Sequence, residues 1–86
     1  MITHVAIKYL GKIFSLPSPN RHHNVIRMIA EETGEGIKDF HKEGFVTSNG
    51  MYLSRREAFI YAKNKNQLNR DPNGYSGDEL FSEDIW

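Results

Sequence analysis

Two stretches of this chain present the same order of folding signals, a hairpin pattern followed at once by a helix start. In the first, Val5, Ile7 and Tyr9 alternate with other residues, which is the period of a half-buried strand. Gly11 tolerates the positive φ of a tight turn, and Pro17 ends the returning strand because proline donates no ladder hydrogen bond. The stretch predicts a β-hairpin over residues 4–15.

A helix is predicted directly after this hairpin. Ser18 is expected as its N-cap and Pro19 as its first helical residue. Gly34 stops the helix in the usual position after the last turn, so the helix should run to about Thr33. The helical period gives it one apolar face, which holds His22, Val25, Ile26 and Ile29.

The second stretch repeats the order. After a connector in which Ile37 and Phe40 suggest one helical turn, strands are predicted at 44–47 and 51–53, joined by an Asn-Gly turn. Ser54 and Glu57 fit a capping box, in which each side chain accepts from the other residue's amide. The second helix should fade near residues 64–66, with three residues packing inward: Ala58, Phe59 and Ala62.

These signals predict the α+β class: one small single domain of residues 1–86, made of two successive β-hairpin–helix (ββα) units. Residues 1–33 form the hairpin plus helix one, and residues 44–67 form the hairpin plus helix two. Residues 68–86 form a polar loop and a docked acidic and aromatic tail. Phe81, Ile85 and Trp86 are expected to dock on the domain or on a partner.

Charge is distributed unevenly along a chain whose net charge is zero. Residues 1–29 carry Lys8, Lys12, Arg21 and Arg27 and no carboxylate, whereas residues 71–86 carry five carboxylates and no base. Zero net charge argues against a general nucleic-acid binder. No cysteine is present, which fits a reducing compartment, and no run of apolar residues is long enough to span a bilayer.

The start of each predicted helix carries cations at a position that disfavours them, because a helix N-terminus is already positive. Helix one begins near Arg21-His22-His23 and Arg27, and helix two begins with Arg55-Arg56. One hypothesis is that an anion sits among them, since arginine grips phosphate or carboxylate in a bidentate manner. The alternative is that His22 is a helix-edge core residue and the other side chains form a solvated face.

Aromatic residues are the candidates for stacking on a nucleobase. The base would stack on Tyr52, Tyr61 or Trp86. The phosphates would be held by Arg21, His23, Arg27 and Arg55, and the site would be oriented by His22. In the alternative, the tail is a docking strap for the arginines.

No catalytic motif is evident, so no catalytic residue, metal site or cofactor is predicted, and the assignment leans away from an enzyme. Adjacent helical residues point about 100° apart, so His22 and His23 would not flank one phosphate symmetrically, nor do they have metal-ligand spacing. A small phosphodiesterase that uses His22 or His23 stays open as an alternative, because histidine titrates near neutrality.

An ordered set of short motifs spans nearly the whole chain. It comprises Ser15-Leu16-Pro17, Arg21-His22-His23, Ile26, Gly44-Phe45, Gly50, Arg55, Glu57-Ala58, Gln67 and Leu80-Phe81-Ser82-Glu83-Asp84-Ile85-Trp86. With this set the sequence resembles a family of small tailed-bacteriophage proteins. The resemblance implies a phage origin and a location in the host cytoplasm, and it implies no activity. Asn66 departs from it, because a glycine is expected there.

The preferred functional hypothesis joins the phage context to the cation clusters. The chain is expected to be a non-enzymatic binder of a nucleotide-like anionic ligand: a counter-defence protein, or sponge, that sequesters an immune signalling nucleotide. A homo-oligomer is expected, with no membrane partner, and nucleic acid is disfavoured. The other hypothesis is a protein-interaction inhibitor of a host enzyme that acts through the acidic and aromatic tail.

Overall fold

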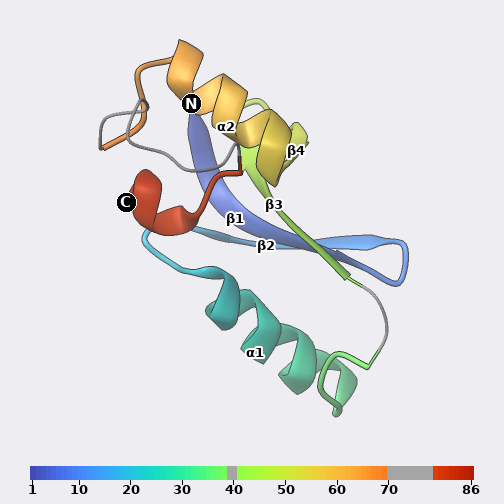
Figure 1. The fold of residues 1–86 in the computed structure, drawn as a ribbon. Helices are drawn as coiled ribbons and strands as arrows, with labels where there is room; N and C mark the ends of the chain where they lie inside the picture. The colour runs from blue at the N-terminus through green and yellow to red at the C-terminus, as the bar shows by residue number, and fades with distance from the viewer. Residues whose placement is uncertain (39–40, 70–78) are drawn as a thin grey trace.

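The computed structural model describes residues 1–38, 41–69 and 79–86. It contains one antiparallel sheet in the order β2-β1-β3-β4, formed by β1 (Ile2–Tyr9), β2 (Lys12–Pro17), β3 (His41–Thr47) and β4 (Tyr52–Ser54). Helix α1 (His22–Thr33) packs beside β1 and β2, and α2 (Arg55–Asn64) packs beside β3 and β4 (Figure 1). A 3₁₀ turn, η2 (Ser82–Asp84), lies near the C-terminus.

The first hairpin forms because two residues accept left-handed backbone at its tip. Leu10 has φ 51° and Gly11 has φ 75°, the signature of a tight turn whose twist matches that of the flanking strands. The turn sets the pairing of β1 with β2, from Tyr9 with Lys12 to His4 with Pro17. Both strands extend slightly beyond the predicted range, and β2 ends at Pro17 as expected.

The sheet has an inner face and an outer face, because side chains alternate along each strand. The inner face carries Val5 and Ile7 on β1, Phe45 on β3 and Leu53 on β4, which pair across the strands. These side chains form one buried core with Val25 and Ile29 of α1, and with Ala58, Phe59 and Ala62 of α2. Both helices therefore cover the same face of the sheet.

The predicted start of helix one is wrong. Ser18 and Pro19 lie in a turn, and the helix begins only at His22. Ser18 donates its amide to the carbonyl of Thr3 at 2.9 Å, and Asn20 donates to the carbonyl of Pro17 at 3.1 Å. These bonds continue the pairing of β2 with β1 and turn the chain, so the residues are unavailable as the first helical turn. The end at Thr33, followed by Gly34 with φ 75°, is as predicted.

The second helix begins at the predicted capping box. The Ser54 hydroxyl accepts from the Glu57 amide at 3.2 Å, and the Glu57 carboxylate accepts from the Ser54 amide at 3.0 Å. The helix ends at Asn64, and Asn66 adopts φ 57°. Asparagine tolerates this left-handed backbone better than most residues, so it fulfils the conformational role of the glycine expected there.

The α+β class is confirmed as a small compact domain, in which the described residues form four antiparallel strands and two α-helices. The description as two ββα units stays a prediction, since both hairpins join one sheet with β1 beside β3. Residues 34–38 contain no helical turn, and Phe40 lies outside the described residues. Most of the polar loop predicted after residue 67 lies outside them as well.

Candidate functional site

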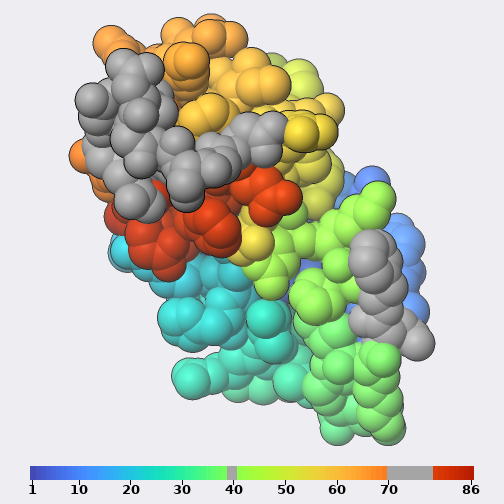
Figure 2. Space-filling view, in the orientation of Figure 1, coloured from blue at the N-terminus to red at the C-terminus, as the bar shows by residue number. Residues whose placement is uncertain are grey.

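The C-terminal segment, residues 79–86, lies between the starts of the two helices. Figure 2 shows it filling the space between the beginning of α1 and the beginning of α2. Leu80 is fully buried, and its amide donates to the Arg55 carbonyl at 3.0 Å. At the other end, Trp86 donates its indole N–H to the Asn20 carbonyl at 2.9 Å. The segment thus joins the two helix starts.

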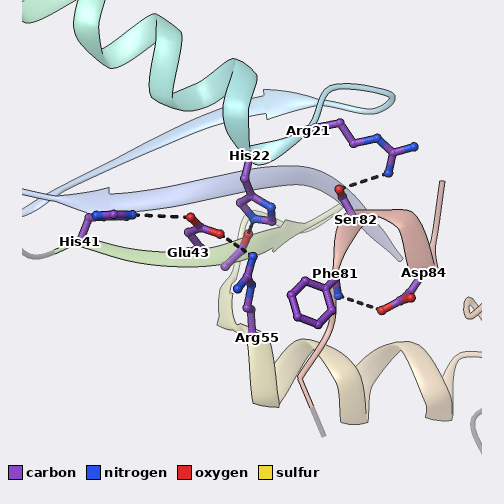
Figure 3. Close-up of polar contacts among 9 residues, drawn as sticks. Arg21, His22, His41, Glu43, Arg55, Phe81, Ser82 and Asp84 are labelled. Carbon is purple, nitrogen blue, oxygen red and sulfur yellow. Dashed lines mark hydrogen bonds and ion pairs between the residues drawn. The ribbon is translucent and has the colours of Figure 1, made fainter. Parts of the chain in front are cut away.

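The two predicted arginine sites meet at this segment. Arg21 donates from Nη1 to the Ser82 hydroxyl at 3.2 Å, while the Arg55 guanidinium lies 4.6 Å from the centre of the Phe81 ring (Figure 3). Arg55 also forms an ion pair with Glu43, and its Nε is buried without a hydrogen-bond partner among the described residues. Both arginines therefore contact neighbouring tail residues, as the docking-strap alternative expects.

His22 occupies a core position beneath this junction. Its Nε2 lies 2.8 Å from the Gly44 carbonyl oxygen and donates to it, and its ring meets Phe45 edge to face at a centroid distance of 5.0 Å. Burial lowers the pKa of His22, because the charged imidazolium loses its hydration. The hydrogen bond to Gly44 and the charges of Glu43 and Glu83 oppose this pKa shift, but burial dominates.

We expect the pKa of His22 to make the fold acid-sensitive. Unfolded histidine titrates near 6.5, so the stability that neutral His22 contributes is fully present above about pH 6.5. It is lost as the pH falls through the lower pKa of the folded state. Urea unfolding between pH 7.5 and 5 should show this loss, and His22→Gln should flatten the pH dependence. Unchanged pH dependence in His22→Gln, or an equal flattening in the exposed control His23→Gln, would contradict this role.

The other predicted ligand residues are dispersed. His23 and Arg27 are exposed on α1, away from the core contacts of His22. The Tyr61 hydroxyl accepts from the N-terminal ammonium at 2.8 Å. Tyr52 lies on the outer face of the sheet, while Trp86 packs against Phe45 at a centroid distance of 6.4 Å. These aromatic side chains do not surround one common space with the arginines.

An open pocket of about 660 Å³ lies between the start of β3 and the start of α2. Seven residues line it: His41, Lys42, Glu43, Ser54, Arg55, Arg56 and Glu79. Four of these side chains carry or can carry positive charge, and two carry a carboxylate. The Glu43 carboxylate already pairs with Arg55 and lies 3.5 Å from His41 Nε2. The pocket is therefore suited to an anion.

Only Arg55 among the eight predicted ligand residues lines this pocket. His41, Lys42 and Glu43 were missed because a run of three polar residues gives no strand period, so they were assigned to a connector. The sequence places Arg56 at the start of helix two, but no local signal distinguishes it as a ligand residue. Glu79 is brought in from the C-terminal segment, and nothing local in the sequence indicates that contact.

The fold and pocket define a class: a small α+β protein with a one-sided antiparallel sheet and an open, mainly basic pocket beside its second helix. Over residues 1–86 the chain matches the family model described as phage T4 y16D protein. The chain belongs to this family, which confirms the resemblance to a small phage protein family. Comparison with curated proteins and with solved structures gave no match.

No helix in residues 1–38, 41–69 and 79–86 has the length and hydropathy needed to cross a membrane. Within the same ranges, no group of three or more histidine, aspartate or glutamate side chains is placed to hold a metal ion.

Proposed function

We propose that this phage protein is a non-enzymatic binder of a nucleotide-like anion, which it holds in the pocket between β3 and α2. The observation that carries the proposal is the lining: His41, Lys42, Arg55 and Arg56 face one open space that also contains the Ser54 hydroxyl. Its volume of about 660 Å³ lies within the range of small-molecule sites, roughly 300–1,000 Å³.

The arginines supply the affinity in this proposal. A guanidinium can give two parallel hydrogen bonds to a phosphate, and such charge-assisted bonds are the strong ones. Arg55 is held in place by Glu43 and Phe81, so little side-chain entropy is lost when a ligand binds. Lys42 and Arg56 are exposed at the rim, where they reach an anion that enters from solvent.

The phage context gives the proposed role. A binder without catalytic groups would act in the host cytoplasm as a counter-defence sponge that sequesters an immune signalling nucleotide. Self-association would suit such a sponge, since an 86-residue domain buries a modest core and gains from further burial.

The other functional hypotheses have less geometric support. An inhibitor that acts through its tail needs that tail to be available, yet Leu80, Ser82 and Asp84 are buried. A phosphodiesterase needs an acid and a base at one phosphate, yet His22 is buried and His23 is exposed on a different side of α1. The pocket is the feature that both alternatives leave without a role.

The pocket is tested by native mass spectrometry after incubation with cyclic dinucleotides, cyclic trinucleotides and cyclic ADP-ribose isomers, followed by titration calorimetry of any that bind. Arg56→Ala is expected to weaken binding roughly tenfold or more, the value of one charged hydrogen bond. The control Arg27→Ala, an exposed arginine on α1, should bind as the wild type does. Equal loss in both variants, or no binding of any nucleotide, would overturn the assignment, and a cleaved ligand would indicate a phosphodiesterase.

A further inference from the structure

We propose that the outer face of the sheet binds single-stranded nucleic acid, with a base stacked on Tyr52 and phosphates held by Lys8 and Lys42. Two residues that the register places on this face, Lys42 and Ser54, also line the pocket, and of these the present proposal uses only Lys42.

Neither helix of the described residues covers the outer face, because both pack on the opposite one. Its strand residues follow from the register: His4, Ala6, Lys8, Ile13, Ser15, Pro17, Lys42, Gly44, Val46, Tyr52 and Ser54. Lys8, Ile13 and Lys42 are exposed. A four-stranded antiparallel sheet backed by two helices and open on the other side is a surface on which unstacked bases can lie.

The charged strand residues of this face are basic, whereas the carboxylates of Glu57 and Glu43 lie near enough for their charge to act on Tyr52. His4, Lys8 and Lys42 project from it, and none of its strand residues carries a carboxylate. Glu57, whose charge acts on both Lys8 and Tyr52, has its carboxylate bonded to the Ser54 amide at 3.0 Å in the helix cap. The face therefore complements a polyanion even though the whole chain is neutral.

Lys8 and Lys42 are direct cross-strand partners in the pairing of β1 with β3. Like charges directly opposite each other on one face of a sheet destabilise the pair. A phosphate between the two ammonium groups would remove that repulsion and gain two ionic contacts. In the free protein the Tyr52 ring and the charge of Glu57 offset part of this repulsion at Lys8, and a bound anion would offset the rest.

Tyr52 is placed as a stacking platform. Its phenol end lies against Gly44, where a Cβ would overlap it, so glycine is what allows the ring to approach the sheet backbone. The Tyr52 hydroxyl is buried and has no hydrogen-bond partner among the described residues. The Lys8 ammonium lies over the ring, 5.2 Å from its centre, so a stacking base would displace it toward a phosphate. The aromatic surface, and not the hydroxyl, is what Tyr52 offers to a ligand.

A single strand fits this face better than a duplex does. Its bases are free to stack on an aromatic ring, and such stacking is tolerant of sequence because every base has a π-face. Base pairs in a duplex are already stacked on one another and would present only phosphates to three basic side chains. Binding is therefore expected to weaken as the salt concentration rises and to favour single-stranded over double-stranded nucleic acid.

Fluorescence anisotropy with a labelled twelve-nucleotide oligothymidylate at low salt tests the proposal. Tyr52→Leu is expected to weaken binding roughly tenfold or more, the usual effect of losing one stacked base, while Tyr52→Phe should bind as the wild type does. Lys8→Ala should weaken binding several-fold and reduce its salt dependence. Lys63→Ala, which removes an exposed lysine from α2, is the charge-matched control.

Three results would overturn the proposal: no binding up to about 100 μM protein, equal affinity for the matching duplex, or equal affinity of Tyr52→Leu and wild type. Circular dichroism of each variant shows whether it is folded, and Tyr52→Phe preserves the ring in any case. Arg56→Ala separates the two proposals, since it should lower nucleotide capture in the pocket and leave oligonucleotide binding by the outer face unchanged.

Discussion

Gly44→Ala is expected to lower the free energy of unfolding by about 3 kcal/mol, at the upper end for overpacked sites. A Cβ at this position would overlap both the Leu53 carbonyl oxygen and the Tyr52 phenol. The tyrosine could rotate away, but the carbonyl belongs to the backbone of β4, so the strand itself has to shift. In a domain of this size the melting temperature should fall on the order of 15 °C.

Thermal and urea unfolding measure this effect, and Gly36→Ala is the matched control. Gly36 has negative φ and open space where its Cβ would lie, so that substitution should leave stability nearly unchanged. The double variant Gly44→Ala with Tyr52→Ala should remain destabilised, because the clash with the backbone persists. Full rescue by the second substitution would show that the tyrosine alone excludes a side chain at position 44.

Removal of Leu80–Trp86 is expected to unfold the domain, and Leu80→Ala alone should cost about 2–5 kcal/mol, as for other buried leucines. Leu80 is fully buried in the core shared by both helices. Truncation also removes Trp86 from Phe45 and Ser82 from Arg21. Because native stability of such domains is about 5–15 kcal/mol, these losses together approach the whole of it.

Circular dichroism and urea unfolding of the truncated chain test this expectation, and Glu83→Ala, in the exposed part of the same segment, is the control. A truncated chain that melts like the wild type would show that the segment is dispensable for folding. That result would revive the hypothesis that the tail acts on a host protein. Unfolding would place the tail among the structural elements and leave the pocket and the outer sheet face as the functional surfaces.

Local signals were sufficient for most elements. The Gly11 and Asn49-Gly50 turns, the Gly34 stop and the Ser54 capping box lie where the sequence predicts them, because each depends on residues only a few positions apart. The start of α1 and the first three residues of β3 were exceptions. Ser18 bonds to Thr3 across the sheet, and a partner fifteen residues away has no local signature.

Placement of the site residues depended on contacts that no local pattern reports. The sequence indicated that Arg21 and Arg55 open two helices but could not show that both reach the tail, at Ser82 and Phe81. It also could not show that Tyr52 lies over Gly44 or that Lys8 faces Lys42, since both contacts follow from the register of separate strands.

By itself, the sequence determined the α+β class, the order of strands and helices, the phage family and the chemistry available, which is arginine, histidine and aromatic side chains without a catalytic motif. The tertiary structure decided which of these side chains meet. It buried His22, committed Arg21 to the tail, and assembled a basic pocket from β3, α2 and Glu79. The physical reason is that periodicity and capping are local properties, whereas a pocket or a sheet face is formed by strand register and by packing between distant segments.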